Sequence, residues 1–411
     1  MPPTAREQSA LRLLFLSNGH GEDAIAASLA RAIHARSVLP LQIEGWPMVG
    51  VGNAYMRGGI PVRGPRNTLP SEGFGTLSLI AFVRDLRAGW LRVHWRQLRA
   101  AMALQGQCDF AVAVGDVVPL AAASLSGAPF VLVGCAKSAY YGGGSGYTWM
   151  ERQLMRRALT SYPRDLRTSE ALTNYGVPTT FFGNPMMDSI ASATAEGEVD
   201  WRDDEIVVAC LPGSRSDHEA NVVEILSLLA VERQRLALHR LTHFAFALPP
   251  HFDLARLRAL MADSSGTQLW RWNDNTAATE LRCDQLRSTL ATGAFSDILS
   301  RARVAIGLGG TANEQAVGSS VPVVTFATAG VQGASYLRMK MPYFGASAIQ
   351  VERSPGALAD ALLRIVGDDK LHARMAAAGR ERMGAPGATD AIASDIARHL
   401  AHIAQSVALH R

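Results

Sequence analysis

The sequence predicts an α/β protein with two doubly wound domains that face each other across a cleft, followed by a C-terminal helical tail. Short apolar runs, Gly-rich turns and helical segments succeed one another in two halves of the chain. The runs are continuous rather than alternating, which is typical of parallel strands covered on both faces. With 411 residues, the chain is also too long for one ordinary core.

In the first half, five apolar runs predict buried parallel strands. They are "LRLLFLS" at 11–17, "LQIEGW" at 41–46, "DFAVAVG" at 109–115, "PFVLVG" at 129–134 and "TTFFG" at 179–183. After the first run, Ile25, Leu29 and Ile33 recur at one-turn spacing, so the segment 22–36 is expected to be an amphipathic helix.

The second half repeats the pattern. Its predicted strands lie in "EIVVACLPG", "THFAFALP", "RVAIGLGG" and "VPVVTF". We expect an N-terminal Rossmann-like domain at 1–190, a small-residue and acidic linker at 191–205, a second Rossmann-like domain at 206–384 and a helical tail at 385–411. The tail is expected to pack back on the first domain. In such sheets, ligands bind beyond the carboxyl ends of the strands.

The composition excludes several classes of protein. It is that of a folded chain, with 48% hydrophobic and 18% charged residues and a net charge of +4. We expect no nucleic-acid partner, and we read neither a leader peptide nor a membrane span. No D-x-D motif or zinc-type spacing occurs, so no metal and no cofactor is expected. The four cysteines are far apart, which favours a reducing compartment: Cys108, Cys135, Cys210 and Cys283.

The turn after the first predicted strand, Gly19 to Ala24, fits the dinucleotide fingerprint G-x-G-x-x-A. Glu44, about twenty residues on, lies where a ribose-binding acid would. However, Glu22 and Asp23 occupy the first helical turn, and carboxylates there repel a diphosphate. The turn therefore suits a hydroxyl-bearing ligand better, with His20 as a candidate acid, base or orienting donor.

Two turns of the second half are better suited to a phosphate. Pro212-Gly213-Ser214-Arg215 places backbone N–H groups, a hydroxyl and a guanidinium before a helix. Gly309-Gly310-Thr311 lets a second helix N-terminus approach a ligand, and Glu314 lies just inside that helix, where a carboxylate can accept both ribose hydroxyls. Together they predict a nucleotide-binding half-site.

At these motifs the chain resembles lipid A disaccharide synthase. The resemblance is carried by "LPGSR", "GGTANE", "NYGVP" and "GNPMMD", in matching order from the first strand to about residue 330. More widely the chain is similar to GT-B glycosyltransferases, including the enzyme that adds N-acetylglucosamine to the lipid-linked peptidoglycan precursor. The resemblance implies an inverting, metal-independent transfer of a sugar, N-acetylglucosamine or a derivative, from a UDP-sugar in the second domain to a lipid-linked or envelope glycan acceptor in the first.

The resemblance also assigns roles to residues. Ser214 and Arg215 would meet the diphosphate, Gly310 and Thr311 would close over it, and Glu314 would hold the ribose. The wider nucleotide-sugar site comprises Gly213, Ser214, Arg215, Gly309, Gly310, Thr311, Asn313, Glu314 and Gln315.

The first domain matches the family less closely. The family's acid after the third strand maps to Asp116, the expected general base, with His20 as its rival. A second family acid is absent, and "KSAYYGGGSGYTWMERQ" replaces an aromatic, basic segment. These departures lie on the acceptor side, so the acceptor can be the lipid A precursor or another glycolipid or prenyl-linked molecule. The acceptor side is expected to comprise Asn18, Gly19, Gly21, Glu22 and Asn184.

The segment 74–104 combines aromatic residues with five arginines and one acid, Asp85. Such a segment suits an anionic membrane surface, and it is equally compatible with ordinary helices whose arginines are solvated. We expect a cytoplasmic protein, and leave open both a peripheral position at the inner face of the cell membrane and a homodimer.

Three other functions remain open. A UDP-sugar 2-epimerase of the same fold needs acids on both faces of the sugar, and Glu22, Asp23 and Asp116 are available for this. An oxidoreductase would bind a nicotinamide or flavin cofactor at Gly19 and Gly21. A non-catalytic envelope-assembly protein would bind a nucleotide without turning it over.

Overall fold

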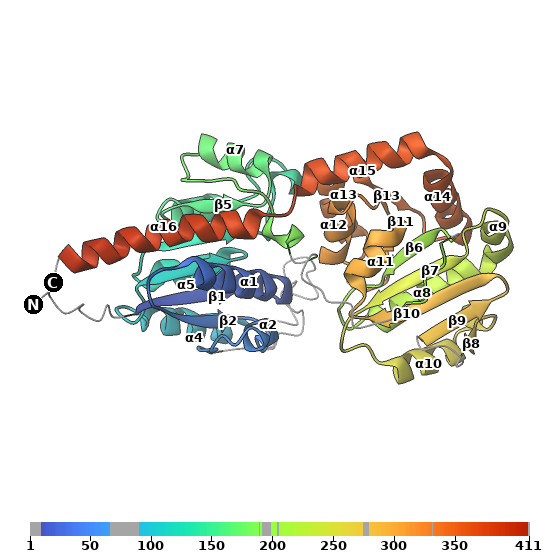
Figure 1. The fold of residues 1–411 in the computed structure, drawn as a ribbon, viewed down its shortest axis with the longest axis horizontal. Coiled ribbons are helices and arrows are strands. Elements are labelled where there is room, and N and C mark those ends of the chain that lie inside the picture. Colours follow the sequence, from blue (N-terminus) through green and yellow to red (C-terminus); the bar gives the residue numbers. More distant parts are fainter. Residues whose placement is uncertain are drawn as a thin grey trace, which may run out of the picture. The chain divides into compact units, whose positions relative to one another are not determined.

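The computed structural model describes residues 10–65, 90–188, 190, 199–203, 205–273, 279–330 and 332–409; the side chains of residues 20, 90–94 and 406–409 fall outside this description. The chain divides into two compact units, Met1–Ser189 with Ala385–Arg411, and Ile190–Gly384. Each unit is built around one largely parallel sheet (Figure 1).

Unit 1 contains a five-stranded parallel sheet in the order β2-β1-β3-β4-β5. Its strands are β1 (Leu11–Ser17), β2 (Leu41–Pro47), β3 (Phe110–Val114), β4 (Phe130–Gly134) and β5 (Ser161–Pro163). Its helices are α1 (His20–Arg36), α2 (Asn53–Arg57), α4 (Trp90–Met102), α5 (Val117–Leu125), η2 (Ala139–Tyr141), α6 (Trp149–Met155), α7 (Leu166–Asn174), η3 (Pro185–Met187) and α16 (Ala388–Leu409).

The side-chain alternation of β1 explains the layers of unit 1. Leu13 and Phe15 pack on one face with residues of α1, α2 and α16, whereas Leu14 and Leu16 pack on the other with residues of α4, α5 and α6. Helix α16 packs along α1, as Figure 1 shows for the red and dark-blue helices. Burial on both faces is the reason that the strands read as continuous apolar runs.

Unit 2 contains an eight-stranded sheet in the order β13-β12-β11-β6-β7-β10-β9-β8. Its strands are β6 (Val207–Leu211), β7 (His243–Leu248), β8 (Arg271–Asn273), β9 (Thr279–Cys283), β10 (Leu286–Thr292), β11 (Ala302–Gly307), β12 (Val323–Phe326) and β13 (Ala348–Val351). Its helices are α8 (His218–Val231), α9 (Arg233–Leu238), α10 (Leu254–Asp263), η4 (Ser265–Thr267), α11 (Phe295–Arg301), α12 (Thr311–Gly318), α13 (Ala334–Phe344), η5 (Gly345–Ser347), α14 (Pro355–Gly367) and α15 (Asp369–Met383).

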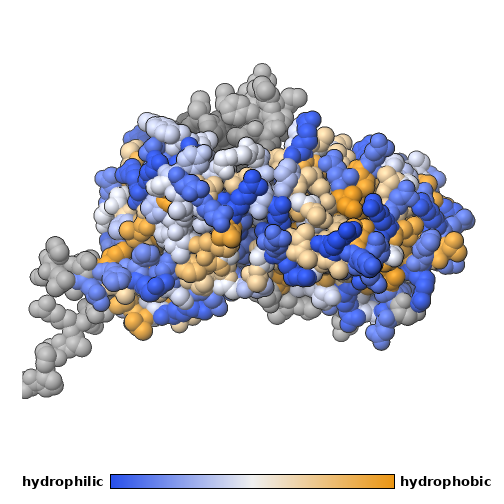
Figure 2. Space-filling model, turned by 90° about the horizontal axis from the view of Figure 1, so that it is seen from above, coloured by the Kyte–Doolittle hydropathy of each residue, from blue (hydrophilic) through white to orange (hydrophobic). Residues whose placement is uncertain are grey.

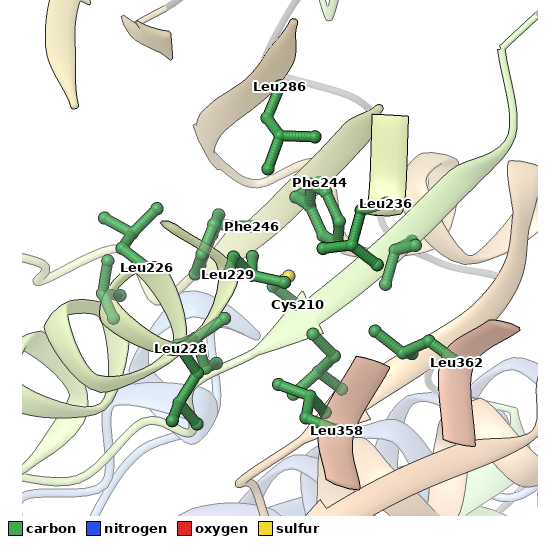
Figure 3. Packing of buried hydrophobic residues seen from close by; sticks show 14 of the residues in the cluster. Cys210, Leu226, Leu228, Leu229, Leu236, Phe244, Phe246, Leu286, Leu358 and Leu362 are labelled. Atoms are coloured by element: carbon green, nitrogen blue, oxygen red, sulfur yellow. The ribbon is translucent and has the colours of Figure 1, made fainter. Parts of the chain in front are cut away.

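The main core of unit 2 lies between its sheet and the helices α8, α9 and α14. Figure 3 shows leucines of α8 and α14 directed toward Cys210 of β6 and toward Phe244 and Phe246 of β7. Cys210, Phe244 and Phe246 are fully buried, and truncating such a phenylalanine to alanine typically costs about 3–5 kcal/mol of stability. Figure 2 shows one face of the molecule, where hydrophilic residues surround scattered hydrophobic ones.

The prediction of two doubly wound α/β sheets with a C-terminal helix is confirmed. The strand predicted at 179–183 is wrong, because this segment contributes only an isolated bridge between Thr179 and Ser161. The fifth strand is instead β5, which is too short to show an apolar run and is held by its ladder to β4. The antiparallel pairs β8–β9 and β9–β10 were not predicted.

Candidate functional site

In unit 2 the strand order reverses between β6 and β11, which are parallel neighbours. Chain connections lead from β6 toward β7 on one side and from β11 toward β12 on the other. Loops leaving two such strands diverge, and open α/β sheets bind their ligands in the crevice expected at such a point. The two turns that the sequence predicts as phosphate sites follow these two strands.

The two turns touch through their glycines. A β-carbon at Gly213 would lie 3.3 Å from the Leu308 carbonyl oxygen and 3.7 Å from the Gly309 Cα. Gly213 also adopts a φ of +93°, which L side chains rarely tolerate. Glycine at 213 is therefore required by its backbone conformation, and the approach of the two turns brings Ser214, Arg215, Gly310 and Thr311 to one place.

The first turn is fixed by hydrogen bonds to its backbone. Asn221 Nδ2 donates to the Pro212 carbonyl at 2.9 Å, and the His218 amide donates to the Arg215 carbonyl at 3.0 Å. Ser214 is exposed and Arg215 is partly exposed. A hydroxyl and a guanidinium thus reach solvent from a turn in which the Pro212 and Arg215 carbonyls are already engaged, an arrangement suited to an anion.

The second turn opens α12. Gly310 is its N-cap and supplies no side-chain cap, and Thr311 is exposed. A β-carbon at Gly310 would lie 3.0 Å from the Tyr336 Oη and 3.9 Å from the Gln332 Nε2. The first N–H groups of α12 therefore lie beside polar side chains of the segment that follows β12.

Of the polar residues predicted within α12, two are buried. Asn313 donates from Nδ2 to the Gly307 carbonyl at 3.1 Å, which braces α12 on the end of β11. Glu314 accepts from the Lys340 Nζ at 2.6 Å in a buried ion pair. Gln315 is partly exposed on the same helix.

Three residues at this site were missed by reasoning from the sequence: Gln332, Tyr336 and Lys340. They belong to "QGASYLRMK", the segment after β12. Their position in the sequence could have revealed them. The segment follows the next strand after β11, and the carboxyl ends of β11 and β12 lie at the same edge of the sheet.

Unit 1 has its own reversal of strand order, between β1 and β3. Asn18 follows β1 and donates from Nδ2 to the Asp116 Oδ1 at 2.7 Å. Asp116 is also the N-cap of α5, where the same Oδ1 accepts from the Val118 amide at 2.9 Å. The structure therefore brings Asn18 and Asp116 together and fixes the orientation of the carboxyl group.

Glu22 covers the glycines of this site. A β-carbon at Gly19 would lie 2.3 Å from the Glu22 Oε2, and one at Gly115 would lie 3.1 Å from the Glu22 Cγ and 2.5 Å from the Asn18 Oδ1. A carboxylate thus occupies the position from which a pyrophosphate would approach Gly19, and it would repel it. Glu44, the expected ribose ligand of a dinucleotide, pairs with Arg63 at 2.7 Å. Both observations disfavour an oxidoreductase that binds a dinucleotide cofactor at this turn.

The remaining predicted residues of unit 1 lie in different environments. His20 opens α1, but its side chain lies outside the described part of the structure. Gly21 is partly exposed in the first turn of α1. Asn184 is fully buried and accepts from the Met186 amide at 3.2 Å, capping η3. Asp23 is 1% exposed and hydrogen-bonded to Ser17, so its carboxyl faces the interior of unit 1.

Helix α4 carries the described part of the predicted basic, aromatic segment; residues 74–89 lie outside the described residues. Gln97 is buried and donates to the Met48 carbonyl, whereas Trp95 is 61% exposed and Arg96 and Arg99 are exposed. Among the described helices, none is long and apolar enough to cross a membrane. Likewise, no cluster of metal-ligating side chains occurs in the described ranges.

The fold identifies the group of proteins that this chain resembles. A UDP-GlcNAc 2-epimerase from Neisseria meningitidis bound to UDP-GlcNAc superposes with a TM-score of 0.58 at 12% identity, covering 94% of this chain and 100% of that one. S. aureus MnaA in a co-structure with UDP gives 0.60 at 14% identity, with 95% and 97% covered. Acinetobacter baumannii MurG gives 0.54 at 16% identity, with 94% and 99% covered.

The chain has the GT-B fold. Its sequence matches no protein-family model and no curated protein. The fold is shared by epimerases and glycosyltransferases, so the similarity supports the predicted architecture and leaves the activity to be argued from the site.

Proposed function

We propose that this protein is an inverting, metal-independent glycosyltransferase. It moves a sugar, N-acetylglucosamine or a derivative, from a UDP-sugar to a lipid-linked or envelope glycan acceptor. The observation that carries the proposal is the meeting of the 212–215 and 309–311 turns at the strand-order reversal of unit 2, with Gly213 against Gly309. Similar structures that contain UDP or UDP-GlcNAc support a UDP-sugar as the ligand.

In this proposal the donor is held by unit 2. The backbone N–H groups at the start of α12 and the Arg215 guanidinium bind the diphosphate, with Ser214 and Thr311 as hydroxyl donors. Glu314 accepts from the ribose hydroxyls, and Lys340 fixes its carboxylate through the 2.6 Å contact. These groups neutralise the charge of departing UDP in the way that a metal ion does in other transferases.

The acceptor is bound by unit 1. The Asp116 carboxylate takes the proton of the acceptor hydroxyl as its oxygen attacks C1 of the sugar. The bond from C1 to the UDP oxygen breaks, and UDP leaves with the bonding electron pair, so the anomeric centre inverts. Asn18 holds Asp116 through its hydrogen bond to Oδ1. His20 remains the rival base.

Ligand binding gives the first test. Thermal-shift measurements with UDP, UDP-N-acetylglucosamine, UDP-glucose and NAD should show stabilisation by the uridine compounds only. At ~100 times the dissociation constant the gain is about 2.7 kcal/mol. Stabilisation by NAD, or by none of the four compounds, would contradict the proposal. Transfer itself is then tested by release of UDP that depends on an added lipid-linked glycan acceptor.

The second candidate is a UDP-sugar 2-epimerase. It is favoured by the proximity of Glu22 and Asp116 around Gly115, which places two carboxyl groups at one site, and by the resemblance to UDP-GlcNAc 2-epimerases. Incubation with UDP-N-acetylglucosamine in D2O, without acceptor, separates the two functions. An epimerase incorporates deuterium at C2 of the sugar, whereas the transferase leaves C2 unlabelled.

A further inference from the structure

The first turn of α8 contacts the 212–215 turn at both of its ends. Asn221 Nδ2 donates to the Pro212 carbonyl at 2.9 Å. Three residues earlier on the helix, the His218 ring contacts the Arg215 carbonyl through Nδ1, and the His218 amide donates to the same oxygen at 3.0 Å. Residues three apart are neighbours on one face of a helix, so both side chains reach the turn from the same side.

This arrangement leaves the middle of the turn for a ligand. Ser214 is exposed, and Gly213 faces the second turn through its contact with Gly309. The Arg215 guanidinium, which the proposed function assigns to the diphosphate, belongs to the residue whose carbonyl the His218 ring contacts. The carbonyl carbon is bonded to the Arg215 Cα, so a hydrogen bond that fixes this carbonyl also fixes the start of the side chain.

The contacts of the His218 ring determine which of its nitrogens carries a hydrogen. A carbonyl oxygen can only accept, so Nδ1 is the donor to Arg215. The other nitrogen, Nε2, lies 2.9 Å from the Glu219 Oε1. Since both nitrogens face oxygen atoms, the His218–Glu219 pair holds a second proton, either on Nε2 or on the carboxyl group. Nδ1 is a donor in both arrangements.

The segment that follows β7 packs around this buried pair. His218 and Glu219 are 4% and 3% exposed. The His251 ring lies edge-on to the His218 ring with centroids 5.2 Å apart, and the Phe252 ring lies 5.3 Å away. The Glu219 Oε1 also accepts from the Asp253 amide at 3.4 Å. Packing and charge thus oppose a flip of the ring that would exchange its two nitrogens.

We propose that His218 is a positioning residue for the donor: its Nδ1–H fixes the Arg215 carbonyl and so directs the guanidinium to the diphosphate, while Glu219 fixes the ring. The hydrogen bond follows from the geometry of unit 2 alone. Its effect on ligand binding rests on the proposed function. Because His218 is buried, we expect it to act on the ligand through Arg215 rather than by direct contact.

Two substitutions of His218 separate the hydrogen bond from the bulk of the side chain. In H218N an amide nitrogen can take the place of Nδ1, whereas in H218L a methyl group takes that place. H218N should therefore keep a donor for the Arg215 carbonyl, and H218L should not. Both variants lack the nitrogen that faces Glu219, so the comparison between them isolates the hydrogen bond to Arg215.

The first experiment measures the affinity for UDP by calorimetry, with thermal unfolding to check that each variant is folded. H218L should bind UDP roughly fivefold more weakly than H218N, which is the effect of one typical net hydrogen bond. Equal affinities of the two variants would overturn the proposal.

A second comparison tests whether His218 acts through Arg215. In the R215Q background, the difference in UDP affinity between H218N and H218L should disappear, because the guanidinium that the carbonyl positions has been removed. A difference that persists in this background would show that the ring affects the ligand by another route, and would refute the positioning role.

The state of the ring can be measured without a ligand. In a nitrogen NMR spectrum of the wild type with 15N-labelled histidine, the His218 signals are assigned as those missing from H218N. Nδ1 of His218 should be protonated at neutral pH, and an unprotonated Nδ1 would overturn the proposal even if UDP binds. If the wild type binds no UDP, the proposed function fails, while this spectrum still decides whether His218 donates to the Arg215 carbonyl.

Discussion

The two strand-order reversals share a topology but are built from different chemistry. In unit 2 the turns meet through the backbones of Gly213 and Gly309, and the acid at that site, Glu314, is paired with Lys340. In unit 1 the turns meet through the side chains of Asn18 and Asp116, and Glu22 lies over the glycines. A glycine-lined crevice with a cation suits a diphosphate, whereas a carboxylate-lined one suits a hydroxyl and a proton transfer.

Under the proposed function, this difference divides the labour of the transfer between the two sheets. Both crevices lie at the carboxyl ends of parallel strands, where topology alone would allow a phosphate. The side chains decide: in unit 1 the acids at the start of α1 disfavour an anion, and in unit 2 Arg215 favours one.

Replacement of the proposed base should have the largest effect. D116N keeps an oxygen that can accept from Asn18 and Val118, so the turn should fold, but it removes the proton acceptor. We expect turnover to fall by roughly 10²–10⁴-fold, measured as UDP release, with unchanged UDP affinity by calorimetry. Near-normal turnover would show that another group, such as His20, is the base.

Removal of the Arg215 cation from the crevice of unit 2 should weaken the binding of UDP. R215Q should weaken UDP binding by about 1.5–3 kcal/mol, or roughly ten- to 150-fold, because it removes a charge-assisted hydrogen bond to the diphosphate. R338Q serves as the matched control, since Arg338 is exposed on α13 and bonded to Ser335. Equal losses in the two variants would mean that Arg215 acts only through long-range charge.

A substitution of Asn18 tests whether turnover depends on the side-chain contact between Asn18 and Asp116 in unit 1. N18A removes the 2.7 Å donor to the Asp116 carboxylate, so turnover should fall about tenfold while UDP affinity stays constant. A loss of UDP affinity instead would contradict the division of labour between the crevices.

The smallest effect is expected for a substitution in helix α4 of unit 1. It tests whether the unit that is proposed to bind the acceptor also binds a membrane surface. Its exposed Trp95 and Arg99 suit a membrane surface with anionic lipid headgroups. R99Q should weaken binding to vesicles of anionic lipid by about 1 kcal/mol, or roughly fivefold, in a flotation assay. Vesicles of neutral lipid should show no such difference. If the protein floats with neither lipid, the arginines of α4 are simply solvated.

Local patterns made much of the fold predictable. Continuous apolar runs located β1 to β4, β6, β7, β11 and β12, since strands buried on both faces must be apolar throughout. The pattern failed for β5, whose three residues are held by pairing to β4 rather than by their own composition. It also failed for β9 and β10, an antiparallel pair joined at Asp284, because polar residues such as Glu280, Arg282 and Arg287 interrupt the apolar residues of these strands.

The candidate site was predictable to a similar extent. Glycine and acid spacings directed attention to the turns after β1, β3, β6 and β11, because turns at strand ends are where helix N-termini and side chains can meet a ligand. The segment after β12, with Gln332 and Lys340, carries no such spacing and was recognised only once its place beside α12 was known.

The sequence by itself determined the class of fold and the chemical character of each turn, because hydrophobic periodicity and residue type act locally. Only the tertiary structure decided which turns are neighbours, since strand order depends on the packing of whole sheets and not on any one segment. It also decided that Asp23 is buried against Ser17 while Glu22, one residue earlier, is partly exposed. Two adjacent acids in a helix point in different directions, and the surrounding core determines which of them loses its water.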